Sequence, residues 1–186
     1  MKIVFSVGHS SHDWPTFKRL LDGADIVAIA DVRSNPASRL PHFNRAALRE
    51  SLNSLGIAYL PMGNVLGGRA HGGGVLDYER AAEDPHFAEA IKKVEQIAAR
   101  TRLALMCSEH EPLTCHRCLL VGRRLAERGV SVAHILRDGS IEPNEVTEDR
   151  LLVLTRQTER DLLATREDRL RAAYRIQGLR IARARR

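Results

Sequence analysis

Residues 107–118, CSEHEPLTCHRC, contain all three cysteines of the chain together with two histidines, two glutamates and one arginine. Thiols, imidazoles and carboxylates are the groups that bind metal ions, attack substrates as nucleophiles and transfer protons. The stretch is therefore open to three interpretations: a metal site, a reactive thiol at the base of a cleft, or three thiols packed in a core. The secondary-structure elements that carry these residues decide among them.

Short apolar runs alternate with amphipathic segments along most of the chain, a pattern typical of alternating strands and helices. Asp13 and Asp84 each precede a helix with proline in its first turn. Asn44 and Thr114 are further candidate N-caps. The predicted strands are residues 2–7, 25–32, 57–60, 103–107 and 130–136. This order predicts an α/β fold, an open and mostly parallel sheet of about five strands with helices on both faces.

The C-terminal part of the chain differs from the rest in pattern and in charge. From about residue 147 it has helix-forming residues and no strand signal. We predict an α/β domain over residues 1–138, followed by a linker and an arginine-rich helical tail over 139–186. Residues 1–150 carry 19 basic and 19 acidic side chains, whereas residues 151–186 carry ten arginines and four acidic side chains. The tail therefore accounts for the net charge of +6.

The composition argues against several classes of protein. No apolar run approaches the roughly 20 residues that span a bilayer, and the first residues, MKIVFSVGHSS, hold too short an apolar run for a signal peptide. We therefore expect a cytoplasmic protein with no membrane partner and with reduced cysteines. Only 4% of the residues are aromatic, which argues against a surface that stacks RNA or single-stranded bases.

Polar side chains follow the predicted strands at the point where each strand ends. Ligands of open α/β sheets bind beyond the carboxyl ends of the strands, so these segments are expected to meet at one edge of the sheet. They are His9-Ser10 after the first strand, Asp31 to Ser34 after the second, Gly67-Gly68-Arg69 in the long glycine-rich loop 61–78, Cys107 to Glu109 at the end of the fourth strand, and Cys115-His116-Arg117 at the next helix start. The loop 61–78 is long enough to be a lid or a binding loop.

Four motifs in this order also carry a family resemblance. They are GHSSHDWPTF, DVRSNPASRLPHFN, the LGGR of residues 66–69, and CSEHEPLTCHR. With them the chain resembles the domain-of-unknown-function 488 family (DUF-488) from residue 3 to about residue 136. The resemblance implies an α/β domain with these motifs as its probable site. It implies no reaction, because none is assigned to the family, and it covers neither Cys118 nor the tail.

Four residues are candidates for catalysis. Cys115 lies at a helix start beside His116 and Arg117, where free amides and neighbouring cations favour the thiolate. Glu109 and Asp31 are carboxylates that can divide acid and base roles. His9 is a candidate general base near neutral pH.

The candidate substrate-binding residues are cationic, small or polar. Arg33 and Arg117 each present a fork of donors suited to a carboxylate or phosphate. The same site is predicted to include Ser10, Gly67, Gly68, Arg69, Cys107 and His116.

Structural alternatives remain open for several of these residues. Arg33 can pair with Glu109, and Arg117 with Asp31, which would leave neither arginine for a ligand. Cys107 can be a small buried residue at a strand end. Cys118, one helical turn after Cys115, is expected to face the core. We predict no metal and no cofactor, because a single Cys-x-x-Cys inside a helix is a weak metal signal.

These observations favour a small enzyme that acts on an anionic substrate, with nucleotide-like molecules among the candidates, by hydrolysis or group transfer. No dinucleotide-binding fingerprint is present, which disfavours redox chemistry. One alternative is a nucleic-acid-associated protein that uses the basic tail. The other is a metal-binding sensor built on the cysteine cluster, with Cys107, Cys115 and His116 or His110 as ligands. The oligomeric state is not predicted.

Overall fold

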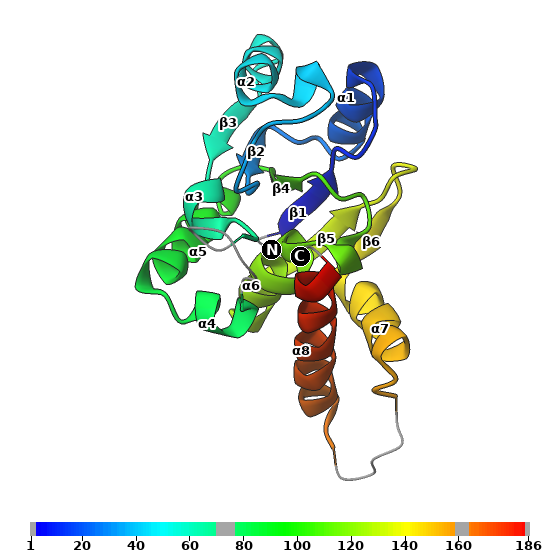
Figure 1. Ribbon diagram of the computed structural model, residues 1–186. Helices are drawn as coiled ribbons and strands as arrows, with labels where there is room; N and C mark the ends of the chain where they lie inside the picture. The colour runs from blue at the N-terminus through cyan, green and yellow to red at the C-terminus, as the bar shows by residue number, and fades with distance from the viewer. Residues whose placement is uncertain (1–2, 70–76, 159–163, 185–186) are drawn as a thin grey trace.

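A computed structural model of the protein describes residues 3–69, 77–158 and 164–184. Its centre is a six-stranded sheet in the order β3-β2-β4-β1-β5-β6 (Figure 1). The strands are β1 (Ile3–Gly8), β2 (Ala28–Asp31), β3 (Ala58–Pro61), β4 (Leu103–Cys107), β5 (Ser131–Ile135) and β6 (Ile141–Pro143). All neighbours are parallel except β5 and β6, which are antiparallel. The predicted α/β fold with a mostly parallel sheet is confirmed.

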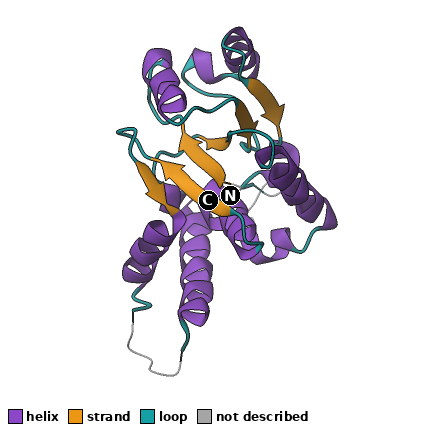
Figure 2. Ribbon diagram, turned by 180° about the vertical axis from the view of Figure 1, so that it is seen from behind, coloured by secondary structure: helices purple, strands orange, loops and turns teal. Residues whose placement is uncertain are grey.

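Helices cover both faces of the sheet (Figures 1 and 2). On one face, α1 (Trp14–Gly23) and α2 (Arg45–Ser54) enclose a core that includes Phe17 and Leu48. On the other face, α5 (Pro85–Ala98) and α6 (Arg123–Glu127) enclose a second core. Apolar side chains of β1, β2 and β4 contribute to both cores, as expected for strands covered on each side.

The strand predictions differ from the structure in two places. The strand predicted over 25–32 begins only at Ala28, because Asp25 has a φ of 50° and the Ile26 amide still bonds to the Leu21 carbonyl of α1. The edge strand β6 was not predicted, and it lies in the segment interpreted as a linker. Its three residues are not buried and end in proline, so they lack the apolar run on which strand prediction depends.

Asp13 and Asp84 are confirmed as N-caps, Asn44 occupies the N-cap position of α2 without a side-chain capping bond, and the prediction for Thr114 is wrong. Asp13 accepts a hydrogen bond from the Thr16 amide, and Asp84 accepts one from His86. The Asn44 side chain instead accepts from the Ser38 amide and so braces the preceding loop.

Thr114 ends the short 3₁₀ turn η2 (Pro112–Thr114), and its hydroxyl bonds to the Glu111 carbonyl. Cys115 is the extended residue that comes before the helix. The helix then runs through a π-helical stretch, η3 (Arg117–Gly122), into α6.

The glycine-rich loop 61–78 contains regular structure. Residues Gly63–Leu66 form the short helix α3, and Tyr78–Ala82 form α4. The backbone passes so close to the segment after β2 that a Cβ on Gly63 would lie 1.8 Å from the Arg33 carbonyl oxygen. Residues 70–76 lie outside the described residues, so a role of this loop as a lid stays a prediction.

The connections of the sheet place a crevice at the end of β4. The chain leaves β1 and β2 toward the face covered by α1 and α2, but it leaves β4 toward the face covered by α6. Because β4 lies between β1 and β2, the connection after β4 diverges from those of both neighbours at the carboxyl edge of the sheet. Open α/β sheets bind their ligands at such a point.

The C-terminal tail is a helical hairpin of α7 (Asn144–Thr155) and α8 (Arg166–Ala184), packed side by side (Figure 1). It is helical as predicted, and it joins the core on the α5 and α6 face, where Leu151 and Tyr174 are buried. The division at residue 138 stays a prediction, but residues on both sides of it share one core. Within the described residues, no helix has the length and apolar character needed to cross a membrane.

This packing predicts that the tail stabilises the fold. Tyr174 is 4% exposed, and we expect Tyr174→Ala to lower the free energy of unfolding by about 3–5 kcal/mol, measured by urea denaturation. Leu179 on the same helix is 45% exposed, so Leu179→Ala is a matched control with an expected change of about 0.5 kcal/mol or less. Equal effects of the two substitutions would contradict a docked tail.

Candidate functional site

A cleft of ≈ 270 Å³ lies at the carboxyl ends of the central strands. Its walls come from the segment after β2, the end of the glycine loop, the end of β4 and the start of the following helix. The lining residues are Arg33, Ser34, Asn35, Ala37, Gly68, Arg69, Cys107, Ser108, Glu109 and His116. The two arginines and the glutamate make it a charged, polar cleft.

Half of the twelve residues predicted from the sequence line this cleft, namely Arg33, Gly68, Arg69, Cys107, Glu109 and His116. The other six do not line it: His9, Ser10, Asp31, Gly67, Cys115 and Arg117. Four lining residues were not predicted, namely Ser34, Asn35, Ala37 and Ser108. Each of them lies within four residues of a predicted site residue in the same motif. This closeness in sequence is the feature from which they could have been predicted.

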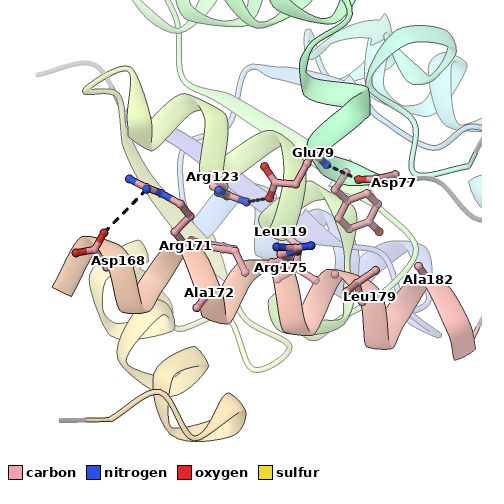
Figure 3. A pocket seen from close by; sticks show the side chains of 13 residues that line it. Asp77, Glu79, Leu119, Arg123, Asp168, Arg171, Ala172, Arg175, Leu179 and Ala182 are labelled. Atoms are coloured by element: carbon pink, nitrogen blue, oxygen red, sulfur yellow. Dashed lines mark hydrogen bonds and ion pairs between the residues drawn. The ribbon is translucent and has the colours of Figure 1, made fainter. Parts of the chain in front are cut away.

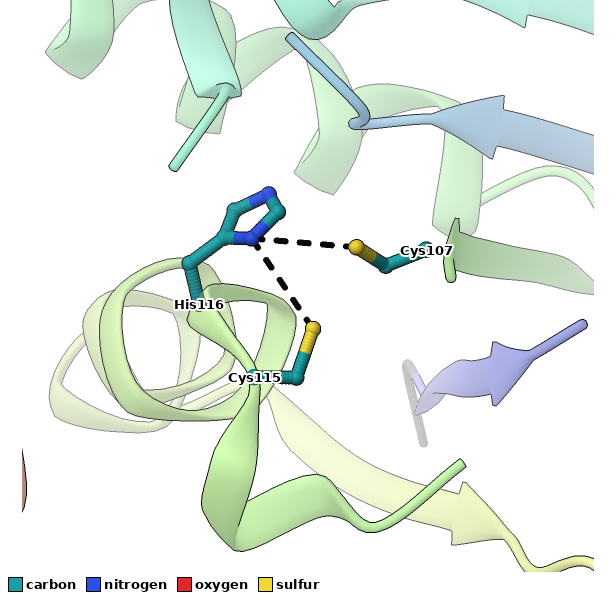
Figure 4. Close-up of side chains that lie close together, drawn as sticks. All are labelled: Cys107, Cys115 and His116. Carbon is teal, nitrogen blue, oxygen red and sulfur yellow. Dashed lines mark hydrogen bonds between the residues drawn. The ribbon is translucent and has the colours of Figure 1, made fainter. Parts of the chain in front are cut away.

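Cys107, Cys115 and His116 form a compact buried cluster (Figure 4). The Sγ atoms of Cys107 and Cys115 each lie 3.8 Å from Nδ1 of His116. One ligand atom from each of the three residues lies within 4.8 Å of the others. Cys107 ends β4, whereas Cys115 directly precedes the next helix and His116 begins it, so the loop between them folds the two ends together.

The His116 ring is held in one orientation. Its Nε2 lies 2.8 Å from the Val32 carbonyl oxygen, which can only accept, so this nitrogen carries the proton. In the neutral imidazole, Nδ1 is then the unprotonated nitrogen that faces the two sulfurs. Gly68 packs against the ring, and a Cβ there would lie 2.5 Å from the His116 Cγ. Glycine at 68 is thus required by the ring.

The pKa values of the two clustered thiols are shifted in opposite directions. Burial opposes ionisation of Cys115, but the hydrogen bond from Cys107 and the charge of Arg117 outweigh it and hold the pKa of Cys115 well below its usual value. The same hydrogen bond, together with burial, raises the pKa of Cys107. These two shifts favour ionisation of Cys115 before Cys107.

Cys118 is separate from this pair. It is fully buried in the core with Leu119 and Leu120, as the sequence predicted. Burial raises the pKa of its thiol far above the usual value, so it remains a neutral packing residue.

Arg33 forms a buried ion pair with Asp31. Nη2 and Nε of Arg33 donate to the two Asp31 carboxylate oxygens at 2.7 and 2.9 Å, and Tyr59 donates to the same carboxylate at 2.7 Å. Both side chains of the ion pair are at most 2% exposed. Arg33 thus pairs within the protein, with Asp31 in place of the Glu109 partner considered as an alternative, and Asp31 is enclosed by donors away from the cleft.

His9 lies against the same arginine. Its Nε2 is 3.3 Å from Arg33 Nη1, and its Nδ1 is 3.0 Å from the Ser10 carbonyl oxygen. Burial, together with the charge of Arg33, lowers the pKa of His9 to about 4. Since Nε2 accepts from Arg33, the imidazole is neutral but its lone pair is occupied. Ser10, with a φ of 48°, forms the turn after β1.

Arg117 is fully buried and holds the loop after β4. Its guanidinium donates to the backbone carbonyls of Glu109 and His110 and to the Ser6 hydroxyl. The alternative pairing of Arg117 with Asp31 does not form, and the side chain is not available to an anion in the cleft. Its charge acts instead on Cys115.

A buried polar network continues from Arg117 toward the tail. The Ser6 hydroxyl lies 2.7 Å from Nδ1 of His134, and Nε2 of His134 lies 3.1 Å from the Asn144 side-chain oxygen. Asn144 and Tyr174 both donate to Glu148. Burial, together with the charge of Arg117, lowers the pKa of His134 to about 4.

A second, larger cavity of ≈ 750 Å³ lies between α8 and α4 (Figure 3). Its charged residues are largely committed to each other, because Arg123 pairs with Glu79 and Arg171 with Asp168. Among the described residues, no cysteine or histidine lines it. The smaller cleft is therefore the better candidate for chemistry.

Comparison with known proteins agrees with the motifs. A family model described as Domain of unknown function DUF488 matches residues 14–123, more than half of the chain. The chain belongs to the DUF488 family. No curated protein and no solved structure matches it at a significant level. The matched region of this DUF488 protein spans all segments that line the cleft.

The buried ion pair predicts a large stability effect. Arg33→Met leaves the Asp31 carboxylate buried without its cation, and we expect a loss of about 3–5 kcal/mol in the free energy of unfolding. Asp31→Asn should cost a similar amount, and the double variant much less than the sum of the two. Urea denaturation of the three variants measures this. Strict additivity would show that the two side chains do not depend on each other.

Two buried neutral histidines predict a pH dependence of stability. His9 and His134 take up a proton near pH 4 in the folded chain, against a usual pKa of 6.5 in the unfolded chain. The unfolded state therefore binds more protons as the pH falls from 6.5 to 4, and the fold loses stability across that window. For the almost fully buried His134 the loss is on the order of 3 kcal/mol.

Denaturant unfolding at several pH values measures this slope. His134→Gln should reduce the slope between pH 6.5 and 4. His86→Gln, at an exposed position on α5, is the matched control and should leave it unchanged. A stability that is constant across the window would contradict the assignment of two neutral histidines.

Proposed function

We propose that this DUF488 protein is a small enzyme that acts on an anionic substrate by hydrolysis or group transfer in the cleft at the carboxyl ends of β2 and β4. The observation that carries the proposal is the placement of Arg33, Arg69 and Glu109 around one cleft of ≈ 270 Å³. That volume is at or below the lower end of small-molecule sites, about 300–1,000 Å³. It suits a small anionic group better than a whole nucleotide.

The two arginines supply the positive charge for binding. Arg69 is exposed, and its backbone amide donates to the Ser34 hydroxyl, which fixes the end of the glycine loop beside the segment after β2. Arg33 uses four of its five donors within the protein. One Nη2 hydrogen has no acceptor among the described residues. We propose that Arg69 is the main contact for the anion and that Arg33 adds one donor from a fixed position.

Glu109 is the proposed general base. Its side chain is exposed at the cleft, next to Cys107 and His116 in the lining. In a hydrolysis, its carboxylate accepts a proton from water as the water oxygen bonds to the electrophilic atom of the substrate. The bond to the leaving group breaks, the leaving group takes the electron pair, and Glu109 returns the proton to it.

The proposal does not use three of the candidates as catalysts. A nucleophile must reach the substrate, and Cys107 rather than the fully buried Cys115 lines the cleft. The lone pair of His9 is occupied by Arg33, and Asp31 is enclosed by donors. We infer that these residues position the others.

The basic tail supports a nucleic-acid partner less well. Arg166 pairs with Glu148 and Asp149, and Arg171 pairs with Glu167 and Asp168. Arg160, Arg185 and Arg186 lie outside the described residues. Binding to nucleic acid therefore stays a prediction.

The three cysteines are free thiols, which supports the inferred reducing, cytoplasmic location.

The proposal predicts binding of a simple anion and a specific catalytic loss. Inorganic pyrophosphate, followed by isothermal titration calorimetry, should bind the protein more weakly as salt rises. Arg69→Met should weaken binding about tenfold or more, since a hydrogen bond to a charged group contributes about 1.5–3 kcal/mol. Arg100→Met is the control, because Arg100 is exposed after α5 and precedes β4, at the opposite edge of the sheet.

Turnover is tested with a panel of activated phosphate and carboxylate esters. Glu109→Gln should keep the affinity for pyrophosphate and lower the hydrolysis rate by about 10²–10⁴-fold. The proposed function would be wrong if pyrophosphate bound wild type and Arg69→Met equally and no ester were hydrolysed.

A further inference from the structure

We propose that Cys107, Cys115 and His116 bind a zinc ion, with its fourth coordination position open to the cleft. Two cysteines and one histidine are a known catalytic ligand set for zinc, in which water or substrate takes the remaining position. The inference deepens the proposed function: the metal site stands on its own geometry, and its catalytic use rests on that function.

The distances are close to those that zinc requires. With Zn–S of about 2.3 Å and Zn–N of about 2.0–2.1 Å, tetrahedral ligand atoms lie about 3.5–3.8 Å apart. Both sulfurs are 3.8 Å from Nδ1 of His116, and no pair of the three ligand atoms exceeds 4.8 Å. Closure around an ion therefore needs a shift of at most about 1 Å in one sulfur–sulfur distance.

The histidine already has the orientation of a metal ligand. Metal-binding histidines donate their other ring N–H to a carboxylate or a backbone carbonyl, which fixes the tautomer. His116 Nε2 makes this contact with the Val32 carbonyl at 2.8 Å, and Gly68 leaves the space that the ring occupies. The unprotonated Nδ1 consequently faces both sulfurs (Figure 4).

A Cys107–Cys115 disulfide is the competing use of the two sulfurs. A disulfide explains their proximity, but it gives no role to Nδ1 of His116, which is equidistant from both. An ion between the three atoms uses all of them. It also satisfies a buried ring nitrogen that otherwise faces two weakly bonding sulfurs.

The fourth position falls on the side of the cleft. Cys107 and His116 line the cleft, whereas Cys115 lies behind them and is fully buried. Among the described residues, no other histidine, cysteine, aspartate or glutamate joins this group. The position is thus left for water or for an oxygen of the substrate, beside Glu109.

Such an ion explains how Glu109 can act near neutral pH. Zinc lowers the pKa of a bound water to about 7, so that a carboxylate at the cleft can accept its proton. The negative group of a substrate would then lie between the ion and Arg69.

The test is the metal content of protein purified under reducing conditions without chelator, followed by titration of metal-free protein with Zn²⁺ and Co²⁺. We expect about one zinc per chain, and intense Co²⁺ absorption of the kind that tetrahedral thiolate sites give. Cys107→Ser and Cys115→Ser should lose the stoichiometric metal. Cys118→Ser is the matched control, since Cys118 is equally buried on the same helix, and it should retain one ion.

Wild-type protein alone can overturn the inference, so it does not depend on the folding of the variants. Metal-free reduced protein that binds neither Zn²⁺ nor Co²⁺ would refute it. So would retention of the ion by both Cys107→Ser and Cys115→Ser, or a Cys107–Cys115 disulfide in place of metal.

The two proposals fail in different ways. Bound zinc without hydrolysis of any ester in the panel would support the metal site and remove the proposed function. Hydrolysis that is undiminished in protein shown to be metal-free would support the function and overturn the catalytic use of the ion, whereas failure to bind Zn²⁺ or Co²⁺ overturns the site itself.

Discussion

The buried guanidinium of Arg117 is the contact on which the site depends. It bonds to two consecutive carbonyls of the loop after β4, at Glu109 and His110, and to the Ser6 hydroxyl of β1. The loop therefore turns back over the helix start and brings Cys115 and His116 to Cys107. A buried cation is costly unless it is compensated. This charge lowers the pKa of Cys115, and ionisation of that thiol would supply the opposite charge.

A second constraint is the close approach of backbone around the cleft. A Cβ on Gly8 would lie 1.8 Å from the Glu109 carbonyl oxygen, and one on Gly67 would lie 2.3 Å from the Ser34 hydroxyl. Gly68 makes the corresponding contact with the His116 ring. Glycine is needed here for lack of space and not for unusual dihedral angles. These contacts fix the position of the loop that carries Arg69, so the cleft is formed before any ligand binds.

Much of the fold could be predicted because its signals are local. Strands such as 103–107 are apolar runs, and Asp13 and Asp84 cap the residues that follow them. The exposed strand β6 has no such signal. In the site, the end of the fourth strand indicated Cys107 and Glu109, the start of the next helix indicated His116, and all three line one cleft. The partners of Arg33 and Arg117 could not be predicted from the sequence. The carboxylates of Asp31 and Glu109 both follow strands expected at the same edge of the sheet, so either could have paired with either arginine. The contact of His116 with Val32 spans 84 residues and depends on the complete fold.

The link between site and tail changes how the tail can be interpreted. From Arg117, hydrogen bonds lead through Ser6 and His134 to Asn144, and on to Glu148 and Tyr174 of the helical hairpin. Buried polar groups destabilise a fold when they lose a hydrogen-bond partner. Removing the hairpin would take away Asn144, Glu148 and Tyr174 and leave the buried network next to the site without these partners. A truncated chain that no longer bound nucleic acid would thus report on folding as much as on charge. Exposed arginines of α8 that make no ion pair among the described residues, such as Arg175 and Arg183, can be replaced without that ambiguity. They are the side chains that separate a binding role of the tail from its structural role.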